Sequence, residues 1–306
     1  MKLSVIVPCY NEAKSLPHFY DELLTIFTLK DMDFELIFVN DGSTDNTLEI
    51  LQSFKHKHPE VIIIDFSRNF GKESGILAGL RETTGERVVL MDADLQDPPQ
   101  LIPDMLKIMD ENACDSVATR RVNRVGEPPI RSFFARQFYK IINRISDVEI
   151  VDGARDYRMM SRTMVNAILQ LSEYHRFSKG IFVWVGFKTH YLEYENIERV
   201  AGETKWNFWS LLRYAFEGII AFTTAPLRLT IFVGLFVSFS SLVYMFYVII
   251  KAMLYGDPVA GYPSMMTIIL FLGGIQLLGI GVLGEYLSKV YMEVKHRPNY
   301  IIKRKY

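Results

Sequence analysis

The chain has 306 residues, of which 49% are hydrophobic and 23% are charged, and its formal net charge is -1. This length and apolar content give room for roughly two domains and exclude a disordered or low-complexity protein. The two cysteines are too few for a disulfide framework, and the near-zero net charge argues against a nucleic-acid partner. Charged residues are spread through residues 1–228, nearly vanish up to residue 288, and then return in a basic tail.

Short apolar runs alternate with helical stretches in the first part of the chain. The predicted strands are residues 3–7, 34–39, 61–66, 87–91 and 116–119, and the helices between them are residues 15–29, 45–57, 71–84 and 99–112. Such alternation predicts right-handed crossovers and a mainly parallel sheet that is covered by helices on both faces.

Polar residues follow each of the first four predicted strands. The loops read PCYNE at 8–12, NDGSTD at 40–45, SRNFGK at 67–72 and DADLQD at 92–97. Loops favour Asn, Asp, Gly and Ser for turn formation alone, so no single loop is decisive. Because parallel sheets bind ligands beyond the carboxyl ends of their strands, four such loops in succession predict a binding site at that edge.

Asp92 and Asp94 lie two residues apart directly after an apolar strand, so in extended backbone both carboxylates point the same way. With the Gln96 amide oxygen they suit Mg²⁺ or Mn²⁺, which take their remaining ligands from water and a substrate diphosphate. The alternative is an acidic loop that only caps the following helix.

The sequence has neither a P-loop nor a dinucleotide-binding glycine turn, so a bound diphosphate would rely on the metal and on cationic side chains. Each candidate is alternatively a solvated surface charge. The candidates are Arg120, Arg121, Arg124, Arg131, Arg199 and Lys205.

Two long apolar stretches, residues 229–250 and 265–287, predict membrane spans. The first is 22 residues without a charge, and a helix of that length extends about 33 Å, enough for a hydrocarbon core of about 30 Å. The short connector predicts a hairpin, and the flanking basic residues put both chain ends in the cytoplasm. Two buried helices of a soluble protein are the alternative. Residues 206–224 are predicted to form interfacial amphipathic helices, or else a helix packed on the domain.

These patterns divide the chain into four segments. We expect a catalytic domain at residues 1–205, interfacial helices at 206–228, a transmembrane hairpin at 229–288 and a basic cytoplasmic tail at 289–306. No signal peptide is expected at the start of the chain.

Seven blocks of sequence together resemble glycosyltransferase family 2, in particular its polyprenyl-phosphate glycosyltransferases, which include bactoprenol glucosyltransferases and dolichyl-phosphate mannose synthases. The blocks are VPCYNE (7–12), VNDGSTDNT (39–47), SRNFGKE (67–73), MDADLQDPP (91–99), RDYRMMSR (155–162), RVAGETKW (199–206) and the apolar block at 270–302. The resemblance covers nearly the whole chain.

The resemblance implies a Rossmann-like GT-A domain anchored in a bacterial inner membrane. The implied reaction is inverting transfer of a hexosyl group, glucose from UDP-glucose by resemblance, to undecaprenyl phosphate on the cytoplasmic leaflet. The product would be a lipid-linked sugar donor for cell-envelope glycans. A homo-oligomer is expected, and a tetramer would fit the family.

The resemblance also assigns roles to individual residues. The nucleotide sugar would be held by Pro8, Tyr10, Glu12, Asp41, Lys72, Asp92, Arg199 and Lys205. The metal would be held by Asp92, Asp94 and Gln96, and the acceptor phosphate by Arg120, Arg131 and Arg136. The catalytic set would be Asp156, Asp94, Arg131 and Lys205.

Asp156 matches the aspartate that is usually proposed as the family's catalytic base. In the surrounding motif Arg155 replaces the usual Gly and Tyr157 the usual Phe, and Ala135 stands where relatives often have Ser. A phosphate monoester has a second pKa of about 6, so the acceptor is largely dianionic at cytoplasmic pH. We therefore expect Asp156 to position other groups rather than to remove a proton.

Three other functions are compatible with parts of the sequence. A processive family 2 polysaccharide synthase usually has more spans and a Gln-x-x-Arg-Trp motif, which this chain lacks. A flippase or channel subunit would need a polar pathway, and Glu285 is the only charge within the predicted spans. A non-catalytic scaffold would not require the acidic pair and the set of cationic residues.

Overall fold

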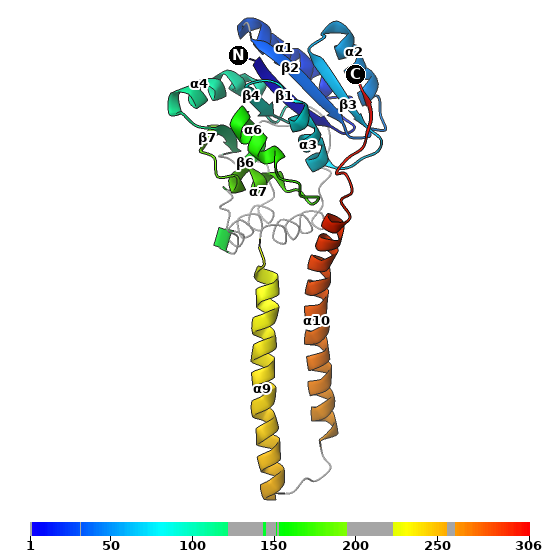
Figure 1. Cartoon of the computed structure of the whole chain (residues 1–306), viewed down its shortest axis with the longest axis vertical. Coiled ribbons are helices and arrows are strands. Elements are labelled where there is room, and N and C mark those ends of the chain that lie inside the picture. Colours follow the sequence, from blue (N-terminus) through cyan, green and yellow to red (C-terminus); the bar gives the residue numbers. More distant parts are fainter. Residues whose placement is uncertain are drawn as a thin grey trace. The chain divides into compact units, whose positions relative to one another are not determined.

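The computed structural model describes residues 2–30, 32–121, 143–144, 151, 153–194, 223–255 and 261–306. The chain forms two compact units (Figure 1). The first combines Met1–Ala221 with Arg297–Tyr306, and the second is Phe222–His296. Of the predicted interfacial segment at 206–224, residues 206–222 lie outside the described residues.

Among the described residues, the first unit contains an eight-stranded sheet with the order β7-β5-β6-β4-β1-β2-β3-β8. Strand β1 is parallel to β2 and β4, β2 to β3, and β5 to β7, whereas β6 is antiparallel to β4 and β5, and β8 to β3. The strands are β1 (Lys2–Cys9), β2 (Asp33–Asn40), β3 (Val61–Phe66), β4 (Arg87–Leu90), β5 (Ser116–Arg121), β6 (Ala154–Ser161), β7 (Thr189–Tyr194) and β8 (Ile302–Lys305). The prediction of a mainly parallel sheet is confirmed.

Helices cover both faces of this sheet. Leu36 and Phe38 of β2 belong to one core, which also contains buried side chains of α1 (Leu16–Lys30), α2 (Thr47–Lys57) and α4 (Ile102–Asn112). Ile37 and Val39 belong to a second core with Ala78 of α3 (Lys72–Glu82). Because side chains alternate along a strand, the apolar run of β2 supplies both cores at once.

The remaining helices of the first unit are shorter. A 3-10 turn, η1 (Pro99–Leu101), leads into α4, and α6 (Arg162–Leu169) and α7 (Ser178–Trp184) follow β6. The side chain of Ser161 accepts a hydrogen bond from the Met164 backbone N–H, 3.2 Å away, and so caps the start of α6.

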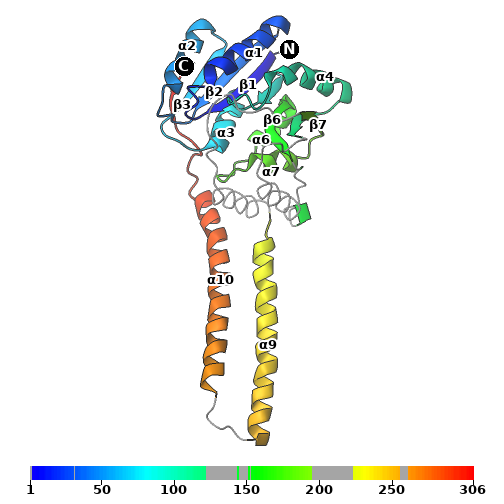
Figure 2. The ribbon, with the colours of Figure 1, turned by 180° about the vertical axis from the view of Figure 1, so that it is seen from behind.

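The second unit consists of two long helices that run side by side (Figures 1 and 2), α9 (Ala225–Tyr255) and α10 (Tyr262–Val294). The Tyr286 hydroxyl of α10 donates a 2.7 Å hydrogen bond to the Thr223 carbonyl oxygen, just before α9. Within the described residues, one helical segment, Phe271–Val294, is long and apolar enough to cross a membrane, and Ala225–Val237 is a shorter apolar segment. The second span stays a prediction.

The segment predicted as a basic tail, residues 289–306, contains regular structure that was not predicted. Helix α10 continues to Val294, and Ile302–Lys305 form strand β8 on the edge of the sheet, beside β3. All four side chains of β8 are exposed, so the strand tolerates three basic residues in succession. Because three of its four residues are basic, the sequence pattern of this segment did not predict a strand.

Candidate active site

The predicted polar loops do meet at one edge of the sheet. In the parallel register Cys9 is paired with Asn40, and Asn40 with Asp65, so β1, β2 and β3 end side by side. The backbone N–H of Met91 donates to the Ile6 carbonyl oxygen at 3.1 Å, which brings the loop after β4 to the same edge. The four loops after these strands therefore begin next to one another.

Lys72, Asp92 and Asp156 form an ionic cluster at this edge. The Lys72 Nζ atom lies 2.7 Å from Asp92 Oδ1 and 2.8 Å from Asp156 Oδ2. Lys72 is the first residue of α3, Asp92 follows β4, and Asp156 lies on β6. Because β6 runs antiparallel to β4, with Leu90 paired to Arg158, the register continues to place Asp156 opposite Asp92.

The charges of this cluster stabilise one another. Burial would raise the pKa of Asp156, but attraction to Lys72, and then to Lys179 and Arg158, outweighs it and holds that pKa well below its ordinary value. Burial would lower the pKa of Lys72, but the two carboxylates raise it well above its ordinary value. Asp156 is therefore ionised, and a carboxylate with so low a pKa is a weak proton acceptor.

The acidic triplet after β4, which consists of Asp92, Asp94 and Gln96, alternates with buried residues. Asp92, Asp94 and Gln96 are partly exposed, and they alternate with the buried residues Met91, Ala93, Leu95 and Asp97. The backbone is not extended throughout as predicted, because β4 ends at Leu90 and Leu95 adopts a φ of 57°. The alternation therefore occurs in a turn, in which every second side chain is buried, and not in a continuous strand.

The donor set of this triplet fits a hard divalent cation. Its two carboxylates and one amide oxygen are the ligand types that Mg²⁺ and Mn²⁺ prefer. In the part of the chain that the structure describes, no three His, Cys, Asp or Glu side chains group closely enough to hold a metal ion by themselves. A metal here would therefore take its other ligands from Gln96, water or a substrate diphosphate, as Mg²⁺ commonly does.

Arg155, which departs from the family motif, has a partner behind the acidic triplet. Its Nε atom lies 3.5 Å from Asp97 Oδ1, and Asp97 also accepts a 3.1 Å hydrogen bond from the Tyr194 hydroxyl. Burial raises the pKa of Asp97 to about 6, against the opposing charge of Arg155. The Tyr157 hydroxyl donates to the Pro98 carbonyl oxygen at 2.9 Å. Both departures therefore contact the end of the loop at 92–98, which the sequence alone did not indicate.

Asp41 holds the loop that leads to Lys72. Its carboxylate accepts hydrogen bonds from the backbone N–H groups of Phe70, at 2.6 Å, and Gly71, at 2.9 Å. Gly42, with a φ of +64°, lies directly against this loop, because a Cβ atom there would be 2.4 Å from the Arg68 carbonyl carbon. Both oxygens of Asp41 thus face protein backbone, and its predicted contact with a nucleoside stays a prediction.

The other predicted site residues are placed as follows. Pro8 is partly buried at the end of β1, and Tyr10 is 39% exposed just beyond it. Glu12 accepts a 2.8 Å hydrogen bond from the Ser15 hydroxyl. Arg120, near the end of β5, pairs with Glu193 at 3.4 Å. Outside the described residues lie Arg124, Arg131, Ala135, Arg136, Arg199 and Lys205.

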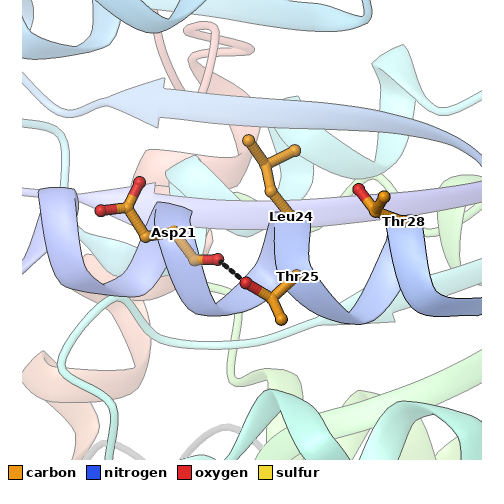
Figure 3. Close-up of a pocket in the computed structure, with 4 residues that line it drawn as sticks. All are labelled: Asp21, Leu24, Thr25 and Thr28. Atoms are coloured by element: carbon orange, nitrogen blue, oxygen red, sulfur yellow. Dashed lines mark hydrogen bonds between the residues drawn. The ribbon is translucent and has the colours of Figure 1, made fainter.

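Figure 3 shows a hollow on the surface of α1. It is lined by Asp21, Leu24, Thr25 and Thr28, and the Thr25 hydroxyl donates a 2.8 Å hydrogen bond to the Asp21 carbonyl oxygen. None of the predicted site residues contributes to it, so it is not part of the candidate active site.

Residues 4–169 match the family Glycosyl transferase family 2, and residues 225–290 match the GtrB C-terminal hairpin family. The chain belongs to glycosyltransferase family 2. This family 2 enzyme is 45% identical over 303 residues to the bactoprenol glucosyl transferase of Shigella phage SfX, covering 99% of each chain. It is also 42% identical to the putative glycosyltransferase CsbB of Bacillus subtilis, covering 98% of this chain and 91% of that one.

Among solved structures, this glycosyltransferase is similar to mannosyl-3-phosphoglycerate synthase from Rubrobacter xylanophilus. The TM-score is 0.50 at 16% sequence identity, with 71% of each chain covered. At that identity the likeness concerns the fold alone. Together with the family match, it confirms the predicted GT-A-like α/β fold and the prediction that the chain is a glycosyltransferase.

Proposed function

We propose that the protein transfers a hexosyl group, with glucose from UDP-glucose as the first candidate, to undecaprenyl phosphate or a similar polyprenyl phosphate. The observation that carries this proposal is that relatives named bactoprenol glucosyl transferase align with 99% of the chain, catalytic domain and hairpin together. The joint match to a family 2 domain and to a GtrB-type hairpin also supports it. The product would supply a sugar for modification of cell-envelope glycans.

The Lys72 cluster has the charges that such a transfer requires. The leaving diphosphate develops negative charge, and fixed positive charge close to it lowers the barrier. Asp92, Asp94 and Gln96 would hold Mg²⁺ or Mn²⁺, which when bound would neutralise part of that charge. Lys72 would present its ammonium group to the donor, and Asp156 would orient Lys72 from the other side. This role for Asp156 agrees with its lowered pKa and with a dianionic acceptor that has no proton to give up.

The remaining residues are assigned to the nucleoside, the acceptor phosphate and the donor phosphates. Pro8, Tyr10, Glu12 and Asp41 would surround the nucleoside, with Asp41 acting through the loop at 67–71. Arg120 would face the acceptor phosphate, together with Arg131 and Arg136. Arg199 and Lys205 would contact the donor phosphates, and Lys205 with Arg131 would complete the catalytic set.

The hairpin would keep the enzyme at the membrane, where its acceptor resides. Helix α9 has 31 residues, or about 46 Å at 1.5 Å per residue, so it is long enough to be a second span beside Phe271–Val294. Basic residues flank the pair, which supports a bacterial inner-membrane protein with its catalytic domain and both termini in the cytoplasm. Assembly into a homo-oligomer belongs to the same proposal.

A product assay tests this proposal. Purified protein in detergent would be incubated with undecaprenyl phosphate, Mg²⁺ or Mn²⁺, and a panel of nucleoside diphosphate sugars, and the lipid products would be weighed by mass spectrometry. We expect a single added hexose, with UDP-glucose as the preferred donor. A ladder of added sugars would identify a processive synthase instead, and the absence of any lipid product with every donor would refute the proposal.

A further inference from the structure

The last residues of the chain pack against β3, the strand that leads into the loop before Lys72. Strand β8 extends the sheet beyond β3, and Tyr306 exchanges two backbone hydrogen bonds with Ile63, at 3.0 and 3.2 Å. Residues 295–301 separate α10 from β8. The end of the chain therefore completes the sheet of the first unit.

This C-terminal segment holds both ends of the Lys72 loop, residues 67–74. The Ser67 backbone N–H donates to the Ile301 carbonyl oxygen at 3.0 Å, and the Ser74 hydroxyl donates to the Asn299 carbonyl oxygen at 3.0 Å. The Asn299 side-chain amide in turn donates to the carbonyl oxygens of Glu173 and Tyr174, both at 3.1 Å. Asn299 is thus fixed from two directions.

Tyr300 supports the same loop through aromatic contacts. Its ring stacks on Phe66 with centroids 4.9 Å apart and planes 13° apart, and Phe66 in turn meets Phe70 edge-on at 5.7 Å. The Tyr300 hydroxyl accepts a 3.1 Å hydrogen bond from Arg81 of α3. Tyr300 therefore connects the end of β3, the Lys72 loop and α3.

We propose that residues 299–302 are a positioning element for Lys72. They hold the two ends of the Lys72 loop while Asp41 holds its middle, so that the ammonium group lies between Asp92 and Asp156. A lysine has a long flexible side chain, and its placement depends on where the backbone at the start of α3 is held. The effect of residues 299–302 on catalysis rests on the proposed function, whereas their effect on the position of Lys72 does not.

Chemical labelling of Lys72 tests the positioning directly. The protein without substrates would be treated with an acylating reagent, and the extent of Lys72 modification followed by peptide mass spectrometry. Tyr300→Leu should accelerate labelling several-fold, because the ammonium leaves its two carboxylates more often. Tyr300→Phe keeps the ring stacked on Phe66 and loses only the exposed hydrogen bond from Arg81, so it should accelerate labelling much less than Tyr300→Leu does. Lys305→Ala, which removes a pair with Glu82 elsewhere in the same segment, should not change the rate.

A second variant keeps the test decisive if Tyr300→Leu folds poorly. Ser74→Ala deletes the hydrogen bond to Asn299, together with the 3.2 Å hydrogen bond of the same hydroxyl to the Phe70 carbonyl oxygen, and leaves the C-terminal segment itself unaltered. It should also accelerate labelling of Lys72. Wild-type labelling rates in Ser74→Ala and in folded Tyr300→Leu would overturn the proposal.

The catalytic consequence is tested by a double-mutant cycle. In the product assay Tyr300→Leu should lower kcat about 10-fold in the wild-type background and have little further effect in a Lys72→Met background, since both changes remove the same function. Independent, multiplicative losses would show that Tyr300 supports only the fold. If the wild-type protein transfers no sugar, the proposed function fails, and the labelling result still decides whether Lys72 is positioned in this way.

Discussion

Replacing Asp41 with asparagine tests whether this residue serves the loop or the nucleoside. Asn has one oxygen acceptor, so one of the two backbone N–H groups that Asp41 now accepts, at 2.6 and 2.9 Å, would face an amide NH₂ instead. Asp41 is 4% exposed, so water cannot replace the lost partner. A hydrogen bond to a charged group contributes about 1.5–3 kcal/mol. We expect Asp41→Asn to lower the free energy of unfolding by about 2–3 kcal/mol.

Thermal unfolding in detergent, followed by tryptophan fluorescence, measures this change. For a unit of this size the loss corresponds to a fall in Tm of about 5–10 °C. Asp21→Asn is the matched control, because Asp21 is an exposed carboxylate on α1 (Figure 3), and it should change the free energy of unfolding by less than about 0.5 kcal/mol. An Asp41→Asn protein that melts like wild type but binds UDP weakly would refute the loop-holding role and favour a direct nucleoside contact.

Three further predictions concern groups around the same loop. Burial raises the pKa of Glu73, which accepts hydrogen bonds from Ser178, from 4.5 to about 7. The folded state therefore binds its proton more tightly than the unfolded state, and the wild type loses stability as pH rises through that window. The free energy of unfolding of Glu73→Gln, relative to that of wild type, should therefore rise by up to about 3 kcal/mol between those pH values. A difference in the free energy of unfolding that does not change with pH would argue against this. Gly42→Ala should lower Tm more than Gly71→Ala does. Both glycines have a positive φ, but a Cβ atom at Gly42 would lie 2.4 Å from a backbone atom, whereas a Cβ atom at Gly71 would have no neighbouring atom within 4 Å. Equal shifts in Tm would contradict that reasoning. Asp156→Asn should lose transfer at every pH, since Asp156 orients Lys72, and a rate restored at alkaline pH would instead identify a base.

The first four strands and their loops were predictable because apolar β-branched runs were each followed by polar residues. Strand β6 was not, because charges interrupt its apolar pattern. Arg158 is buried there at 4% exposure, and its guanidinium lies 3.9 Å from the Phe182 ring centroid. The contact between Lys72 and Asp156 depends on the antiparallel register of β4 and β6, which joins residues far apart in the chain. No local pattern encodes that pairing.

The role of Asp41 and the strand in the C-terminal segment were also not predictable from local sequence patterns. Asp41 lies in a loop whose composition suits both turns and ligands, and only its hydrogen bonds to Phe70 and Gly71 distinguish the two uses. Residues 299–306 combine aromatic and β-branched residues with basic ones, and the basic residues dominate the sequence pattern. Their place beside β3 follows from long-range pairing rather than from local preference.

The central claim is that the acidic triplet at this sheet edge serves sugar transfer to a lipid phosphate. The most direct measurement compares wild type, Asp92→Asn and Asp94→Asn in vesicles containing undecaprenyl phosphate, with radiolabelled UDP-glucose and Mg²⁺ or Mn²⁺. We predict label in the lipid fraction for wild type and a loss of at least about 100-fold in both variants. Both variants should remain folded, with a lower Tm for Asp92→Asn because it loses its charge pair with Lys72. Variants that fold normally and label the lipid at the wild-type rate would contradict the claim.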